Sequence, residues 1–379
     1  MSSTGKMRPR GKRPDAHDGD GHSTAGDNTI APSSVAPSPP TSPTSASRKV
    51  VTITSLEGPT VRPAEKRGVS SLVPHAPKLP APVQFPLLAT LSLSISALLY
   101  SLTYQFTRAP LATNERVLED WSEVALLTGW KLFQLGLGWY GNFDSIDLAA
   151  LTVLSQGPSL YLLSTFYSTP VVPLVSSLVI EVLSATLPFH LLRPLNAAHA
   201  EPSQAPNSDI VADRPIALLT TLLAAAIYSV SLLFAYATYL PTFLVVYFNN
   251  LASITPAHEA SYISFLPVTL ALGLAAQTFI FAPTTSVART AQDDVNDSFN
   301  PVEAGLGATV WWNVWGWSTR TKVAMGRTLV LMLVSGVSSA LKARYEVLGV
   351  ETAGAVAWGS VWVLAAGITG VGLGAVGST

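Results

Sequence analysis

Two short acidic motifs are the first groups in this sequence whose spacing could support chemistry. Asp144 and Asp147 form one motif, and Asp293, Asp294 and Asp297 form the other. Carboxylates three residues apart share one face of a helix, where they can hold Mg²⁺ and, through it, a diphosphate. The motifs therefore predict, as one alternative, a Mg²⁺-dependent membrane enzyme of lipid or prenyl transfer. The competing interpretation is structural, because aspartate is common in loops as a cap and turn residue.

Glu181 is the second group of interest, because it lies in the middle of the apolar segment 171–192. A charge at the centre of a bilayer costs about 2.5–3.5 kcal/mol on insertion scales, so this residue should face the interior of a helix bundle. Ser177 and Ser184 share its helical face at i−4 and i+3. Lys131, in the middle of segment 124–140, offers a cationic partner if that segment spans.

Polar residues of other segments extend this interior. Gln156 lies beside Pro158, where the sequence predicts a break in a helix, and Gln277 ends a polar stripe in segment 262–283. One interpretation is a hydrated cavity in a transporter-like bundle, with Glu181 as a proton or cation site. The alternative is a satisfied ion pair within a non-catalytic membrane organiser, where polar residues join the helices.

Apolar segments of bilayer length must position these groups. Charged residues make up 12% of the chain, about half the share of a typical soluble domain, and hydrophobic residues make up 48%. A spanning helix needs about 20 mostly apolar residues. The segments near this length are 86–106, 146–166, 171–192, 215–239, 262–283, 323–341 and 354–376, with 124–140 as the weakest. The sequence thus predicts an all-α, polytopic transmembrane bundle with eight spans, or seven if 124–140 does not cross.

The N-terminal region has a different composition. Residues 1–84 are rich in Pro, Ser and Thr, and they carry eleven basic and six acidic residues without an apolar period. Such a segment cannot bury enough surface to fold. We therefore expect a disordered, basic cytosolic tail over 1–84 and a membrane domain over 85–379. The tail could bind cytosolic partners or anionic lipid, whereas its lack of interleaved aromatic residues argues against nucleic acid.

The distribution of Lys and Arg predicts the orientation of the spans, because basic residues collect on the cytosolic side. With eight spans and a cytosolic N-terminus, eight basic residues near span ends fall inside and four fall outside. With seven spans, five fall inside and seven fall outside. We therefore expect a protein of the plasma membrane or an endomembrane, with eight spans and both termini in the cytosol.

A tryptophan-rich stretch precedes segment 323–341. Tryptophan favours the membrane–water interface, and the cytosolic ends of spans favour Lys and Arg. We expect this stretch to anchor the chain at the interface, and we expect Arg327, a turn inside the span, to extend outward to the same interface. The predicted anchor consists of Trp311, Trp312, Trp315, Trp317, Arg320 and Lys322.

The last apolar segment carries small residues rather than chemistry. Gly370 and Gly374 form a GxxxG motif, which lets helices pack closely within a chain or between two copies. The chain has no cysteine, so disulfides and thiolate metal sites are excluded. Because nucleotide-binding, zinc-protease and hydrolase motifs are absent, the sequence favours a protein without enzyme activity and without a cofactor.

Overall fold

The structure is a computed structural model that describes residues 80–378, apart from 106, 108–110, 113 and 201–205. Most of the predicted tail, residues 1–79, therefore lies outside the described residues. The long helices are α1 (Ala81–Leu102), α3 (Trp121–Tyr140), α4 (Ser145–Phe166), α5 (Val171–Leu192), α8 (Arg214–Ala237), α11 (Tyr262–Ala276), α15 (Thr319–Tyr345) and α16 (Thr352–Ser378). The short helices are α6 (Ala197–Ala200), α7 (Ser208–Val211), α9 (Leu240–Tyr247), α10 (Thr255–His258), α12 (Ala282–Thr285), α13 (Ala291–Asp297) and α14 (Leu306–Trp315).

Seven helices of the described chain are long and apolar enough to cross a membrane. Six of them are α1, α4, α5, α8, α15 and α16, and the seventh is the run Tyr262–Thr285, in which a π-helical turn, η2 (Gln277–Phe281), joins α11 to α12. α3 is 20 residues long, but it contains Glu123 and Lys131 and is not among the seven. Each predicted segment thus corresponds to one helical run, and the predicted all-α polytopic transmembrane bundle is confirmed.

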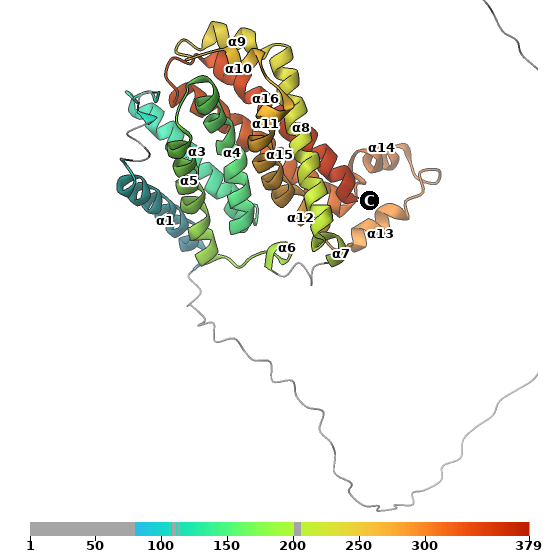
Figure 1. Ribbon diagram of the computed structural model, residues 1–379. Helices are drawn as coiled ribbons and strands as arrows, with labels where there is room; N and C mark the ends of the chain where they lie inside the picture. Colours follow the sequence, from blue (N-terminus) through green and yellow to red (C-terminus); the bar gives the residue numbers. More distant parts are fainter. Residues whose placement is uncertain (1–79, 106, 108–110, 113, 201–205, 379) are drawn as a thin grey trace, which may run out of the picture. The chain divides into compact units, whose positions relative to one another are not determined.

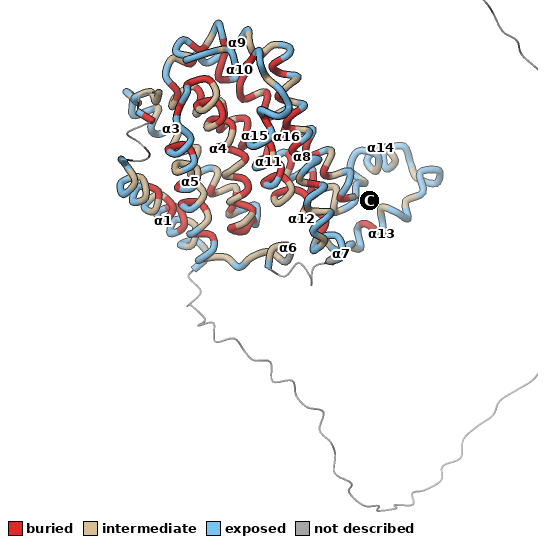
Figure 2. The backbone as a smooth tube through the Cα atoms, in the orientation of Figure 1, coloured by how far each residue is buried: buried red, intermediate tan, exposed pale blue. Residues whose placement is uncertain are grey.

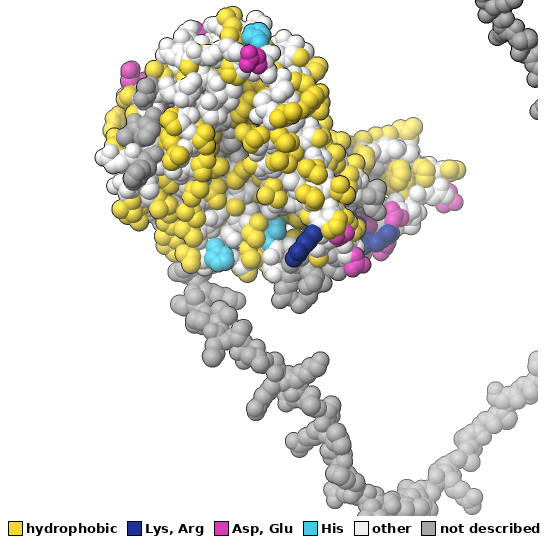
Figure 3. All heavy atoms as spheres, in the orientation of Figure 1, with side chains coloured by type: hydrophobic (Ala, Val, Ile, Leu, Met, Phe, Trp, Pro, Cys, Tyr) yellow, Lys and Arg dark blue, Asp and Glu magenta, His cyan; other side chains and the backbone are white. Residues whose placement is uncertain are grey.

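Side-chain types on the surface agree with this assignment. Hydrophobic side chains cover the middle of the face drawn in Figure 3, and the charged side chains in view lie toward its edges. An apolar band between polar ends is the arrangement that a bilayer requires.

The long helices run alternately up and down the bundle, and α3 takes one of these passes (Figure 1). We name the end at which α1 begins the proximal end, and the opposite end the distal end. At the proximal end, Arg193 after α5 donates to the carbonyl of Trp139 in the last turn of α3 at 2.9 Å and to that of Phe143 in the following turn at 3.0 Å. At the distal end, Asn114 before α3 donates to Thr169 after α4 at 2.9 Å. These contacts place the two ends of α3 at opposite ends of the bundle.

The core lies mainly along α4, α8, α11, α15 and α16, whereas α1 and α3 lie at the edge (Figure 2). In an apolar stretch of 18 residues within each helix, 72% of the α4 stretch is buried, against 22% of the α1 stretch. Trp358 and Trp362 of α16 pack against Tyr161 of α4 at ring-centroid distances of 6.2 and 6.3 Å. A Cβ on Gly359 of α16 would lie 2.8 Å from the carbonyl oxygen of Gly336 of α15. Large rings and small residues therefore fill complementary parts of the core.

α4 continues through Pro158, so the predicted break at this position is wrong. A proline lacks the backbone N–H, which leaves the carbonyl of Leu154, four residues earlier, without its helical partner. The hydroxyl of Ser335 in α15 donates to that carbonyl at 3.3 Å. A neighbouring helix thus replaces the missing hydrogen bond, as a membrane helix that contains proline requires.

Candidate functional site

The first polar centre joins Glu181 of α5 to Lys131 of α3. The distance between Oε2 of Glu181 and Nζ of Lys131 is 3.0 Å. Tyr100 of α1 donates to the other carboxylate oxygen of Glu181 at 3.1 Å, and its hydroxyl lies 2.9 Å from that of Ser177. Lys131 also donates to the hydroxyl of Ser96 at 3.3 Å. Both charges are therefore compensated inside the bundle, which offsets part of the cost of removing them from water.

A cavity of about 640 Å³ opens beside this pair, between α1, α3, α4, α5 and α15. Four residues of the predicted polar interior line it: Lys131, Gln156, Ser177 and Glu181. Ser184 instead donates to the carbonyl of Glu181 within α5. Gln277 lies in η2 and does not line the cavity. The structure thus brings together part of the predicted interior, whose role in binding or transport stays a prediction.

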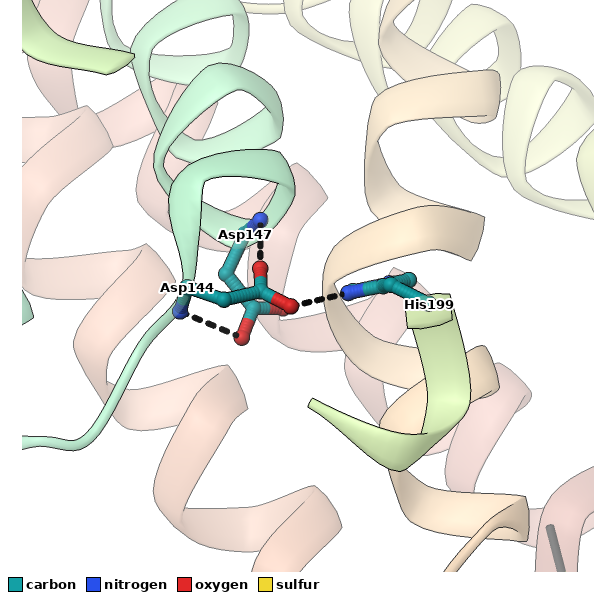
Figure 4. Close-up of side chains that lie close together, drawn as sticks. All are labelled: Asp144, Asp147 and His199. Atoms are coloured by element: carbon teal, nitrogen blue, oxygen red, sulfur yellow. Dashed lines mark hydrogen bonds and ion pairs between the residues drawn. The ribbon is translucent and has the colours of Figure 1, made fainter. Parts of the chain in front are cut away.

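The second polar centre lies at the proximal end, where the loop between α5 and α8 meets the start of α4 (Figure 4). Asp144 is the N-cap of α4 and accepts the backbone N–H of Asp147 at 2.8 Å. His199 of α6 directs its Nδ1 atom at Oδ2 of Asp144, 2.7 Å away. Asn196 donates its backbone N–H to the same oxygen at 3.0 Å. One capping carboxylate therefore fastens this loop to α4.

Arg327 of α15 contributes the positive charge of this centre. Its guanidinium binds the two carboxylate oxygens of Asp147 at 2.6 and 3.0 Å, and donates to the carbonyl of Phe279 in η2 at 2.8 Å. The rings of Phe143 and Phe279 lie 5.0 and 5.1 Å from its central carbon. A buried carboxylate and two aromatic rings hold the Arg327 guanidinium at the proximal end, and its predicted reach to the membrane interface stays a prediction.

Contact between Asp144 and His199 shifts the titration of both side chains. Burial alone would lower the pKa of His199, but the hydrogen bond and charge of Asp144 outweigh it and raise that pKa above its usual 6.5. Burial alone would raise the pKa of Asp144, but hydrogen bonds from His199 and from the backbone N–H groups of Asp147 and Asn196 lower it below 3.8. The arrangement therefore favours a protonated imidazole beside an ionised carboxylate.

The donor atoms of Asp144, Asp147 and His199 lie within 4.8 Å of one another, a spacing that a metal ion could bridge. Both oxygens of Asp147 bind Arg327, however, and Nδ1 of His199 binds Asp144. A metal ion would also face the permanent positive charge of the guanidinium. These residues fit an ion-pair network better than a metal centre, and the network clamps α4, α15 and the α5–α8 loop together.

The second acidic motif begins with a capping residue. Asp293 accepts the backbone N–H of Thr290 at 2.8 Å and that of Thr319 at 2.6 Å, so it caps α13 and ties it to the start of α15. These two backbone N–H groups lower the pKa of Asp293 to about 2. Asp293 therefore has a structural role within this part of the chain.

The other two acids of the motif are exposed and share one cation. Asp294 and Asp297 both bind the guanidinium of Arg289. Among the residues that the structure describes, no hydrogen bond or ion pair joins them to Asp144 or Asp147. The two acidic motifs are thus compensated separately, and the contacts give no support to a shared Mg²⁺ site.

Trp311, Trp312 and Trp315 of the tryptophan-rich stretch lie in α14, which stands beside the bundle and has no buried residue (Figure 2). Trp312 stacks on Phe299 at a ring-centroid distance of 5.2 Å. Arg320 and Lys322 lie in the first turn of α15, close to this stretch in the sequence. The exposed tryptophans are Trp311, Trp315 and Trp317, at 69%, 53% and 48%. Exposed indole rings next to basic residues are typical of an interfacial segment, and the anchor role stays a prediction.

Sequence reasoning missed two partners in the proximal centre. Arg327 is a single charge in the apolar segment 323–341, which could have indicated a buried acid, but nothing local pointed to Asp147. His199 lies 55 residues from Asp144, and no motif connects them. Only the packing of the α5–α8 loop against α4 brings these side chains together.

The fold and its two buried centres define a multi-span helical membrane protein with internally paired charges. Residues 213–343 match the family described as Bouquet formation protein 3 C-terminal domain. The match covers about a third of the chain and runs from the N-cap of α8 nearly to the end of α15, so it includes Arg327 but not Glu181, Lys131 or Asp144. No curated protein and no solved structure matches the chain.

Proposed function

We propose that this protein is a non-catalytic organiser, a rigid helical platform in a membrane on which an assembly is built. The observation that carries this proposal is the match of residues 213–343 to the C-terminal domain of bouquet formation protein 3. That description names the formation of a structure rather than a reaction.

Packing within the matched region supports a platform. A Cβ on Gly273 of α11 would lie 2.7 Å from the carbonyl oxygen of Thr221 of α8, so these backbones are in direct contact. Ser229 of α8 also donates to Thr269 of α11 at 2.9 Å. Close backbone contact and a hydrogen bond across one interface favour a fixed arrangement of the helices.

Pairing of the buried charges supports the same function. Glu181 binds Lys131, and Asp147 binds Arg327, in each case within the chain. Such pairs contribute to a unique arrangement of helices, and breaking one leaves an uncompensated charge. An organiser needs this arrangement, whereas a carrier must exchange at least one such partner during its cycle.

Gene replacement in the source organism tests the organiser function, with bouquet formation as the readout. A strain without the protein should fail to form the bouquet. The variant Glu181→Gln, which keeps the size of the side chain but leaves Lys131 without its counter-charge, should lower the stability of the protein and still restore the bouquet at temperatures where it is folded. A normal bouquet in the strain without the protein would show that the proposal is wrong.

A transporter-like function centred on Glu181 is the second candidate, and the cavity of about 640 Å³ favours it. In that case Glu181→Gln should abolish proton or cation flux in proteoliposomes even where the variant is fully folded. Equal flux in liposomes with the protein and in protein-free liposomes would remove this candidate.

The third alternative is Mg²⁺-dependent lipid or prenyl transfer, and its test is Asp294→Asn. This variant should leave every phenotype intact, because Arg289 already binds that carboxylate.

We also propose that the chain crosses the membrane eight times, with the proximal end of the membrane domain on the cytosolic side. The membrane is then the plasma membrane or an endomembrane. The course of α3 supports the eighth pass, and the positions of basic residues support the orientation. Near the proximal end of the described chain lie Arg193, Arg214, Arg289, Arg320 and Lys322, and near the distal end lie Arg116, Lys342 and Arg344. On this orientation α14 lies at the cytosolic interface, and the tail is available to cytosolic partners.

A further inference from the structure

We propose that the cavity beside Glu181 binds one molecule of a neutral lipid that carries a free hydroxyl group. This proposal goes beyond the organiser function and does not depend on it, because it concerns helices outside the matched region as well as α15. It also differs from transport, because a resident lipid needs no path through the bundle.

The size of the cavity restricts the ligand. At about 640 Å³ it falls within the range of roughly 300–1,000 Å³ that holds one drug-sized molecule. A single-chain or fused-ring lipid fits this range better than a phospholipid with two long acyl chains. The apolar part of the wall that would contact hydrocarbon includes Leu93, Ala97, Leu127, Leu135, Leu148 and Leu151.

Charges around the cavity restrict the ligand further. Lys131 and Glu181 on the cavity wall already compensate each other. The cations of the lining are Arg116, Lys131 and Lys342, and the anions are Glu115, Glu181 and Glu346, so the lining has no net charge. Beside Lys131 and Glu181, a charged ligand would have to break their ion pair or leave one charge uncompensated. The lining therefore selects a neutral molecule.

Two polar side chains on α4 supply the specific contacts. Thr152 and Gln156 lie one helical turn apart, and both line the cavity. Gln156 is only 7% exposed. Within the part of the chain that the structure describes, neither side chain is among those with a sealed polar atom that lacks a partner, so their polar atoms are open to the cavity. The Gln156 amide faces the cavity, where a ligand hydroxyl can both donate to its oxygen and accept from its nitrogen.

Photolabelling of the purified full chain tests the proposal. The probes are a photoreactive sterol and a photoreactive monoacylglycerol, each with a free hydroxyl, and a photoreactive lysophosphatidic acid as the charged comparison. At least one neutral probe should label the cavity-lining peptides of α1, α3 or α4 saturably, and the charged probe should not. No saturable labelling, or equal labelling by the charged probe, would overturn the proposal.

Variants of the two α4 residues distinguish this site from general lipid contact. Gln156→Leu keeps about the same side-chain volume but removes the amide. It should lower the affinity for the neutral probe about tenfold, which corresponds to the loss of one hydrogen bond of about 1.4 kcal/mol. Gln277→Leu, outside the cavity, is the matched control and should bind as the wild type does. If Gln156→Leu does not fold, Thr152→Val replaces it and should weaken binding in the same direction. Unchanged binding in the folded variant would show that the assigned contacts are wrong.

Discussion

At the residue scale, the Asp147–Arg327 pair determines how α4, α15 and η2 meet. Removal of one partner from a buried pair leaves the other charge uncompensated and typically costs about 3–5 kcal/mol. Arg327→Met should therefore lower the free energy of unfolding by about 3–5 kcal/mol, measured by denaturant titration in detergent. Lys322→Met, on the same helix, is the control and should change it little. Equal losses in the two variants would mean that the ion pair is not the cause.

A second residue, His199, should make stability depend on pH. Because its folded pKa is raised, its contact with Asp144 stabilises the protein fully below pH 6.5, and this contribution is lost as the pH rises through the folded pKa. His199→Gln should thus be less stable than the wild type at pH 6, and the difference should narrow toward pH 9. Thermal unfolding at several pH values measures this, with the exposed His258→Gln as the control. A constant difference across the range would contradict the assignment.

At the element scale, the contact between α15 and α16 depends on particular glycines. A Cβ on Gly359 would meet the backbone oxygen of Gly336 at 2.8 Å, and a backbone cannot rotate away. A Cβ on Gly374 would meet only the methyl group of Ala324, at 3.4 Å. Gly359→Ala should therefore lower stability by about 1–3 kcal/mol, while Gly374→Ala should be neutral or slightly stabilising. Unfolding curves of the two variants compare them directly.

α14 is the element whose place in the membrane tests the anchor. If Trp311 and Trp315 lie in the interface, lipids brominated near the head group should quench the fluorescence of the wild type. The double variant Trp311→Ser/Trp315→Ser should lose most of this quenching. Trp358→Phe, in the buried core, should retain it. Similar quenching in the wild type and the double variant would place α14 away from the interface.

At the scale of the whole molecule, the chain has no cysteine, so single cysteines report on topology without a background. Glu119→Cys precedes α3, and Pro194→Cys follows α5; both positions are exposed. With eight passes they lie on opposite sides of the membrane, whereas with seven they lie on the same side. A membrane-impermeant maleimide applied to sealed vesicles should therefore label only one of the two. Labelling of both would show that α3 does not cross.

Much of the fold could be predicted from the sequence, because apolar length is a local property. Segment 171–192 coincides with α5, and segment 146–166 begins one residue after the start of α4. The contact between Glu181 and Lys131 was also within reach, since each charge lies in an apolar segment and an unpaired charge there is costly.

Tertiary structure alone decided the proximal centre and the course of α4. Pro158 predicts a break from local chemistry, but Ser335 of a distant segment replaces the hydrogen bond and the helix continues. Arg327 binds Asp147, 180 residues away, because α4 and α15 pack against each other. The sequence by itself thus determined which segments enter the membrane, since that depends on the transfer of each segment from water. Which polar groups meet there depends on how the helices pack, and no local pattern encodes that.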